Sequence, residues 1–317
     1  MATISVVIPV YNAESCIGEL YDRLVRSLEL VTNDFELLFV EDCSPDQSWD
    51  RIRELAARDK RIKGLKFSRN FGQHHSIAAG LDHCDAEWVV IIDCDLQDPP
   101  EAIPQLLAKA RDGYDVVLAR RSEGAGNWLR QLMTRAFAGV FETLTGRHYD
   151  HRVGAFRLLS RRVVLAYRQF TEKTRLLGPA IDWLGFPTVH VDVARSPRYA
   201  GESAYSIAKL IGLAADGIMA YSDRPLRMCV KLGMIISGAS LLVGLALIIY
   251  TFVGGHPVPG WTSVIVSIYF LSGLIIAIVG MCGMYIAKIF EETKNRPHYI
   301  VQDRIGDFPA RRYHFTR

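Results

Sequence analysis

The sequence lacks the cysteine spacing of a zinc site or a redox-active pair. Its six cysteines form no CxxC motif and no other spacing typical of metal ligands. They are Cys16, Cys43, Cys84, Cys94, Cys229 and Cys282. We therefore expect reduced thiols, as is usual for proteins of the cytosol.

A strong excess of one charge is also missing, as is a leader peptide. The 37 Lys and Arg residues nearly balance the 34 Asp and Glu residues, which leaves a formal net charge of +3. This balance gives no electrostatic reason to expect a nucleic-acid partner. Met1 leads directly into a strand-like run, without the basic start or the cleavage site of a signal peptide. We therefore expect no secretory leader.

Charge is absent from two long apolar stretches, 232–253 and 264–286. Each could cross a hydrocarbon core of about 30 Å as a helix. The turn between them, at 254–260, contains no Lys or Arg, whereas basic residues lie on both outer flanks. The positive-inside rule then predicts a hairpin of two membrane helices with both chain ends in the cytoplasm. Two buried helices of a globular domain are the alternative.

The part of the chain before these stretches alternates between strand and helix patterns. Apolar runs predict strands at 4–8, 35–40, 62–67, 88–92 and 116–119. Helices are predicted at 15–31, 49–55, 73–83 and 100–111. Ser44 and Gln47 are expected to form a capping box at the start of the second helix. Such alternation is typical of a parallel sheet with helices on both faces, which binds ligands beyond the carboxyl ends of its strands.

Acidic residues gather where the fourth predicted strand ends. Asp93, Asp95 and Gln97 alternate along the chain, so in an extended conformation their side chains would point to one side. Carboxylates this close repel one another unless a cation compensates them. Oxygen ligands favour Mg²⁺ or Mn²⁺, so these residues are a candidate metal site. An acidic turn that caps the next helix is the alternative, above all for Asp98.

Four segments at these loops resemble, in order and spacing, a family 2 glycosyltransferase with the GT-A fold, a Rossmann-like α/β domain. They are VVIPVYNAE (6–14), FVEDCSPDQS (39–48), SRNFGQHHSIAAGLDH (68–83) and IIDCDLQDPPE (91–101). The resemblance is narrower to dolichol-phosphate mannose synthase and to bacterial polyprenyl-phosphate glycosyltransferases. FRLLSRRVV (156–164), RYAGESAYS (198–206) and the C-terminal hairpin extend it over most of the chain.

The resemblance implies a nucleotide-sugar site at the first strand ends. Pro9, Tyr11 and Glu14 would border the nucleotide, and Asp42 would contact its base or ribose. Asp93 would belong both to this site and to the DxD motif.

The resemblance also implies the metal ligands and the acceptor site. Asp95 and Gln97 would be the direct ligands of the metal, beside Asp93. Arg121 would lie near the acceptor phosphate and act in catalysis with the two aspartates. Arg135 and Arg198 are further candidates for the same phosphate.

One departure from the resembled branch concerns the segment before FRLLSR. That branch commonly carries acidic residues there, whereas this chain has Arg152, Val153, Gly154 and Ala155. No catalytic aspartate is therefore expected at position 155.

The implied enzyme is a membrane-anchored, inverting glycosyltransferase. It would transfer a sugar from a nucleotide diphosphate sugar, with UDP favoured, to a polyprenyl phosphate such as undecaprenyl phosphate. The reaction would need Mg²⁺ or Mn²⁺ and would take place at the cytoplasmic face of the inner membrane. The expected parts are a catalytic domain (1–204), interfacial amphipathic helices (205–231), two membrane helices (232–253 and 264–286) and a cytoplasmic tail (287–317). Both a monomer and a homo-oligomer are compatible with the sequence. The alternative function is a catalytically inactive membrane scaffold that serves a lipid-carrier pathway.

Overall fold

The computed structural model describes residues 3–121, 139, 142, 152–173, 175–194, 224–253 and 260–308. The chain divides into two compact units. The first holds Met1–Leu132, Asp150–Ala204 and Arg296–Arg317, and the second holds Met133–Tyr149 and Tyr205–Asn295.

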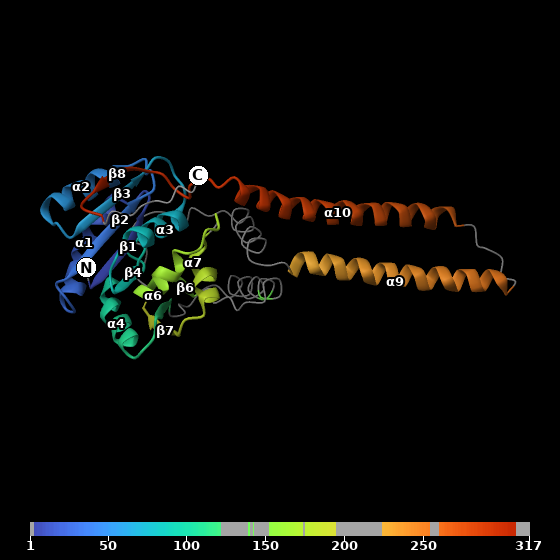
Figure 1. Cartoon of the computed structure of the whole chain (residues 1–317), viewed down its shortest axis with the longest axis horizontal. Helices are drawn as coiled ribbons and strands as arrows, with labels where there is room; N and C mark the ends of the chain where they lie inside the picture. The colour runs from blue at the N-terminus through green and yellow to red at the C-terminus, as the bar shows by residue number, and fades with distance from the viewer. Residues whose placement is uncertain are drawn as a thin grey trace. The chain divides into compact units, whose positions relative to one another are not determined.

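An eight-stranded mixed sheet forms the core of the first unit, in the order β7-β5-β6-β4-β1-β2-β3-β8 (Figure 1). The strands are β1 (Ile4–Val10), β2 (Phe35–Glu41), β3 (Ile62–Phe67), β4 (Trp88–Ile91), β5 (Val116–Arg121), β6 (Val153–Ser160), β7 (Thr188–Val193) and β8 (Val301–Ile305). The parallel pairing predicted for the first four strands is confirmed. A wholly parallel sheet is wrong, because β6 runs antiparallel to β4 and β5, and β8 runs antiparallel to β3.

Helices cover both faces of this sheet. They are α1 (Glu14–Glu29), α2 (Ser48–Arg58), α3 (Gln73–His83), α4 (Ile103–Arg111), which follows the 3-10 turn η1 (Pro100–Ala102), α6 (Arg161–Tyr167) and α7 (Leu177–Leu184). One apolar cluster joins α1, α2 and α4 to the sheet, and a second joins α3, α6 and α7 to the other face. All seven residues of β1 are buried, because both faces of the strand are covered.

Helix α3 lies very close to β1 because of one glycine. A Cβ added at Gly80 would lie 2.2 Å from Cγ1 of Val7, so no larger residue fits there without a shift. The close approach fixes the position of α3, whose first residue reaches the candidate site.

The predicted capping box at α2 is wrong. Gln47 occupies the N-cap without a side-chain capping bond, and Ser44 Oγ donates instead to Asp46 Oδ1 at 2.5 Å. The same carboxylate accepts a hydrogen bond from Ser48 N at 3.1 Å. Asp46 therefore satisfies a backbone donor at the start of the helix, as an N-terminal cap usually does.

The chain after the last helix returns to the sheet. We call residues 296–308 the C-terminal strap. The strap contributes β8 and stacks Tyr299 on Phe67, with ring centroids 5.3 Å apart. Tyr299 Oη also donates to Asp82 on α3 at 3.1 Å. Part of the expected C-terminal tail thus forms an edge strand of the sheet, which the sequence analysis did not predict.

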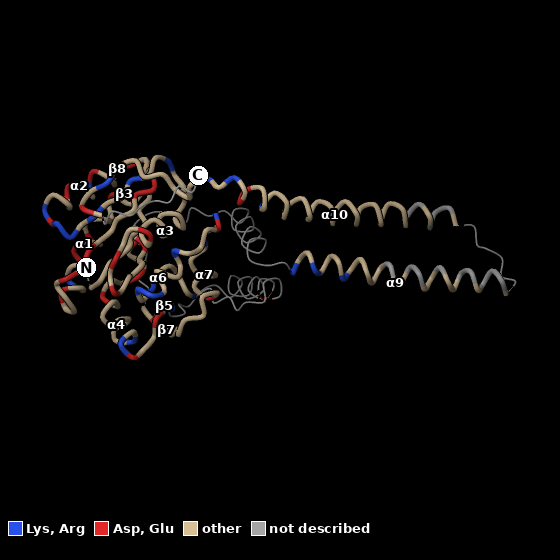
Figure 2. The backbone as a smooth tube through the Cα atoms, in the orientation of Figure 1, with Lys and Arg blue, Asp and Glu red and all other residues tan. Residues whose placement is uncertain are grey.

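The second unit contains two long helices, α9 (Arg224–Phe252) and α10 (Trp261–Thr293). Within the described residues, one segment is long and apolar enough to cross a membrane, namely Ser267–Thr293. Its most apolar window has a mean hydropathy of 2.2, and none of that window is buried in the protein. Figure 2 shows charged residues at the start of α9 and at the end of α10, with uncharged stretches between. Residues 254–259 of the predicted turn and most of the predicted interfacial segment lie outside the described residues.

Candidate active site at the carboxyl ends of the strands

The acidic residues after β4 lie in a turn and not in an extended chain. Strand β4 ends at Ile91, residues 94–96 turn, and Leu96 takes a positive φ of 59°. Cys94 and Leu96 are buried in the apolar core, whereas Asp93 and Asp95 stay partly exposed. The turn therefore presents two carboxylates at the carboxyl end of a central strand, although the extended geometry predicted for it is wrong.

Hydrogen bonds orient both carboxylates. Gln73 Nε2, from the first residue of α3, donates to Asp93 Oδ1 at 2.6 Å. The backbone N–H of Gln97 donates to Asp95 Oδ1 at 3.1 Å. The side chain of Gln97 is buried, with 6% of the residue exposed. Helix α3 and the turn itself thus hold the acidic pair in place.

The donor set at this turn is compatible with a hard divalent cation. In the described part of the chain, no group of three or more His, Cys, Asp or Glu side chains could hold a metal. The candidate ligands are two carboxylates, Asp93 and Asp95, and the amide of Gln97. Mg²⁺ commonly binds with only one or two protein carboxylates and takes substrate phosphate oxygens as further ligands. The residues present therefore fit Mg²⁺ or Mn²⁺ shared with a substrate.

Asp42, predicted to contact the nucleotide, anchors a loop. Its Oδ1 accepts a hydrogen bond from Phe71 N at 2.6 Å, and its Oδ2 accepts one from Gly72 N at 2.8 Å. Gly72 has a φ of 98°, a conformation that glycine adopts at low cost. Burial raises the pKa of Asp42, and the two N–H donors act against that rise. Both oxygens are thus engaged in holding the start of α3.

Glu41, the last residue of β2, is a candidate that the sequence reasoning missed. The residue is 1% exposed, and Ser44 N donates to its Oε1. Its Oε2 is buried and has no hydrogen-bond partner among the described residues. Burial raises the pKa of Glu41. A carboxylate directly after the apolar run 37–40 was the signal available in the sequence.

Hydrogen bonds join the loops after β1 and β2. Glu14 N donates to Asp46 Oδ2 at 3.0 Å, and Glu14 Oε2 accepts from Gln47 N at 3.2 Å. Glu14 is therefore a connection between two helix starts. Pro9 is buried in β1, whereas Tyr11 is 54% exposed beside this junction. Of the residues predicted to border the nucleotide, Tyr11 has the most accessible surface.

Of the three arginines predicted to bind the acceptor phosphate, the structure describes the backbone of one. Arg121 is the last residue of β5, at the same sheet edge as the acidic turn. Its side chain is outside what the structure describes, as are Arg135 and Arg198. The neighbouring Arg120 forms an ion pair with Asp192 of β7 at 2.6 Å.

Arg157 on β6 is a second residue that the sequence reasoning missed. It pairs with Ile91 of β4 and Leu118 of β5, and it is 6% exposed. Its guanidinium donates to the carbonyl oxygens of Gly154 at 2.6 Å and Ala155 at 3.1 Å. Because β6 is antiparallel to its neighbours, these carbonyls lie at the edge that carries the acidic turn. A buried cation therefore lies next to the candidate site.

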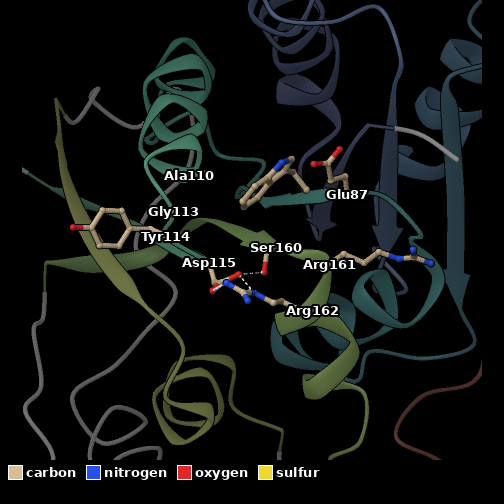
Figure 3. Close-up of a pocket in the computed structure, with 9 residues that line it drawn as sticks. Glu87, Ala110, Gly113, Tyr114, Asp115, Ser160, Arg161 and Arg162 are labelled. Carbon is tan, nitrogen blue, oxygen red and sulfur yellow. Dashed lines mark hydrogen bonds and ion pairs between the residues drawn. The ribbon is translucent and has the colours of Figure 1, made fainter.

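A hollow of about 350 Å³ lies at the other edge of the sheet (Figure 3). It is lined by Glu87, Trp88, Ala110, Gly113, Tyr114, Asp115, Ser160, Arg161 and Arg162. Asp115 accepts a hydrogen bond from Ser160 Oγ at 2.7 Å and forms an ion pair with Arg162. These contacts join the start of β5 to the end of β6, far along the strands from the acidic turn. The hollow is thus separate from the candidate site.

The solved structures to which the chain is similar include distant ones. A crystal structure of glucosyl-3-phosphoglycerate synthase from Mycobacterium tuberculosis gives a TM-score of 0.48 at 20% identity, covering 69% of this chain and 78% of that chain. A likeness at this level supports no conclusion about activity.

Sequence comparison is more informative. The SfII prophage-derived bactoprenol glucosyl transferase of Shigella flexneri is 38% identical over 300 residues, covering 94% of this chain and 97% of the relative. The glycosyltransferase YkcC of Bacillus subtilis (strain 168) is 37% identical, covering 95% and 94%. A prophage bactoprenol glucosyl transferase homolog of Escherichia coli (strain K12) is 35% identical, covering 94% and 98%. The pattern of glycosyl transferase family 2 matches residues 5–167. The chain belongs to this family and is a glycosyltransferase.

Proposed function

We propose that this glycosyltransferase transfers a sugar from a nucleotide diphosphate sugar, with UDP favoured, to a polyprenyl phosphate at the cytoplasmic membrane face. The observation that carries the proposal is the partly exposed Asp93 and Asp95 pair at the carboxyl end of β4, oriented by Gln73. Relatives named as bactoprenol glucosyl transferases, matched over almost their whole length, support the lipid acceptor.

The donor nucleotide is assigned to the ends of β1 and β2. Glu41 brings a buried carboxyl oxygen that lacks a partner among the described residues, and a base or ribose donor group would satisfy it. Tyr11 supplies an exposed ring next to it. Pro9 and Glu14 shape the loop that borders the nucleotide, and Asp42 acts through the loop that it anchors.

The diphosphate is assigned to the acidic turn. Asp93, Asp95 and Gln97 would hold Mg²⁺ or Mn²⁺, which when bound offsets the negative charge that develops on the leaving diphosphate. Gln73 keeps Asp93 in position for this task, because its amide donates a hydrogen bond to Oδ1 of the carboxylate. The metal and the nucleotide together would complete the site.

The acceptor phosphate needs positioning more than activation. A phosphate monoester is already anionic near neutral pH, so its oxygen can attack the anomeric carbon without a strong general base. Ala155, where an aspartate would be the candidate base, agrees with this chemistry. Arg121, with Arg135 and Arg198 as further candidates, would grip the phosphate, since arginine binds its oxygens with a planar fork. A single direct displacement inverts the anomeric centre.

The membrane anchor is assigned to a hairpin of α9 and α10. The C-terminal strap pairs with β3, in the same sheet as the strands that precede α9. A chain that leaves this sheet, crosses a membrane through Ser267–Thr293 and returns to the sheet must cross an even number of times. Helix α9 is the candidate for the other crossing, which would put both chain ends in the cytoplasm.

The experiment that tests the function uses the full chain in detergent with radiolabelled undecaprenyl phosphate. A panel of nucleotide sugars is offered with Mn²⁺ or Mg²⁺, and the lipid product is separated by chromatography. We expect one donor to give a glycolipid, and we expect EDTA to abolish it. The Asp95→Ala variant should lose at least about 100-fold in rate, because a metal ligand at the leaving group is gone.

A failed reaction would also be informative. A wild-type protein that forms no product with any donor and binds no nucleotide would contradict the proposal. The catalytically inactive membrane scaffold would then be the better description. An Asp95→Ala variant as active as the wild type would contradict the role assigned to the acidic turn.

A further inference from the structure

Arg157 has more hydrogen-bond donors than the protein satisfies. A guanidinium carries five N–H groups. The Nε and Nη2 atoms donate to the carbonyls of Ala155 and Gly154, and Nη1 donates to no residue that the structure describes. No carboxylate in the described chain forms an ion pair with it, although only 6% of the residue is exposed. A buried charge in this state is costly unless another group compensates it.

The surroundings of Arg157 belong to the candidate site. Its strand neighbours Ile91 and Leu118 lie in the apolar cluster that contains α3, α6 and α7. Its charge is attracted by Asp182 of α7 and by Asp93 of the acidic turn. Together with burial, it lowers the pKa of His74 on α3. The guanidinium is therefore within electrostatic reach of α3, which orients Asp93, and of the acidic turn.

The charge of Arg157 persists at neutral pH. Burial lowers the pKa of Arg157 to about 10, and the attraction of Asp182 and Asp93 limits the fall. Position 155, whose carbonyl it contacts, is alanine, so no carboxylate at this strand position neutralises it. A positive group with free donors thus remains at the edge where the reacting phosphates would meet.

We propose that Arg157 is a substrate-contacting residue whose free N–H donors bind a phosphoryl oxygen. This inference rests on the proposed function, which brings two such groups to the site, the diphosphate of the donor and the phosphate of the acceptor. Both carry anionic oxygens that an arginine fork grips more strongly than a neutral donor does. Binding of either one would also compensate the buried charge.

The test compares Arg157→Met and Arg157→Lys with a matched control, Arg168→Met, in the full chain. Arg168 also donates to two backbone carbonyls, those of Leu81 and Cys84, but at the other end of α3. KM is measured for the nucleotide sugar and for the polyprenyl phosphate. The Kd of UDP with Mn²⁺ and thermal protection by decaprenyl phosphate are measured alongside.

We expect Arg157→Met to raise the KM of one substrate by about 10- to 100-fold, as loss of a charge-assisted hydrogen bond predicts. Arg157→Lys should recover part of the loss, and Arg168→Met should leave both KM values unchanged. A higher KM for the nucleotide sugar with weaker UDP binding identifies the diphosphate as the ligand. A higher KM for the lipid with weaker protection by decaprenyl phosphate identifies the acceptor.

The opposite result is equally clear. If Arg157→Met and Arg157→Lys only lower the melting temperature, as Arg168→Met would, Arg157 is structural and the inference is wrong. If Arg157→Met does not fold, the Arg157→Lys variant decides alone. If the wild type forms no glycolipid, the proposed function fails, and the two binding measurements decide about Arg157. Weaker binding of either probe by the Arg157 variants keeps the inference. Unchanged binding, or no binding by the wild type, overturns it.

Discussion

Glu41 and Asp42 are adjacent carboxylates at the end of β2 with different partners. Both oxygens of Asp42 accept backbone N–H groups from the loop before α3. Glu41 uses only one oxygen, for Ser44 N, and keeps the other without a partner among the described residues. Adjacent residues at a strand end point in different directions. Asp42 can therefore hold the loop before α3 while Glu41 keeps an oxygen for a ligand.

Exchanging each acid for its amide should separate these two tasks. Asp42→Asn replaces an acceptor by an NH₂ group that opposes Phe71 N or Gly72 N, so we expect a loss of about 1–3 kcal/mol of stability. Glu41→Gln keeps the acceptor for Ser44 N, so it should change the melting temperature little and weaken UDP binding instead. Thermal unfolding and UDP titration of both variants check this. Equal effects on both readouts would show that the two carboxylates share one task.

At the scale of the element, sequence patterns were reliable for the buried strands and helices. The strand 62–67 and the helix 73–83 have the predicted bounds. The loop positions followed from them, and so did the place of Asp93 and Asp95. Parallel strands with both faces covered leave the strongest signal in a sequence.

The elements that the sequence did not predict have mixed patterns. Strand β7 (Thr188–Val193) alternates polar and apolar residues, whereas strand β8 (Val301–Ile305) has three polar residues in a row. Both are edge strands, and each depends on a partner far away in the chain. The hydrogen bonds of Asp42 with the loop before α3 also join distant parts of the chain, so no local sequence pattern predicts them. So is the burial of Arg157, which a strand pattern alone would assign to either face.

A contact between two histidine rings joins the strap to α3. His75 stacks on His298 of the strap, with ring centroids 6.4 Å apart. Burial, then the nearby His298, His74, Arg175 and Arg69, lowers the pKa of His75 to about 4. The ordinary value is 6.5, so the folded chain binds fewer protons than the unfolded chain between these values. The free energy of unfolding therefore rises with pH through this window.

The expected outcome is a loss of stability as the pH falls from 7 toward 4.5. The His75→Phe variant keeps an aromatic ring but cannot bind a proton, so its melting temperature should fall less over the same range. Thermal unfolding of both proteins at matched ionic strength checks this. Parallel pH profiles for the two proteins would show that His75 does not contribute to the effect.

At the scale of the whole molecule, the strap links membrane topology to the catalytic sheet. The strands before α9 and the strand after α10 share one sheet, so they lie on one side of any membrane that the chain crosses. A single crossing through Ser267–Thr293 would leave β8 on the far side and remove the edge strand from β3. If Ser267–Thr293 crosses a membrane, the proposed crossing by α9 would keep β8 beside β3, which is an argument for the hairpin that does not use the positive-inside rule.

Reporter fusions test this topology. Alkaline phosphatase fused after Gly260 should be active, because the link between α9 and α10 would lie outside the cytoplasm. The same reporter fused after Arg317 should be inactive, whereas a fluorescent protein fused there should mature. An active phosphatase at the C-terminal end would mean an odd number of crossings. In that case β8 could not pair with β3 in the membrane-bound enzyme, and the contacts of Tyr299 with Phe67 and Asp82 could not form there either.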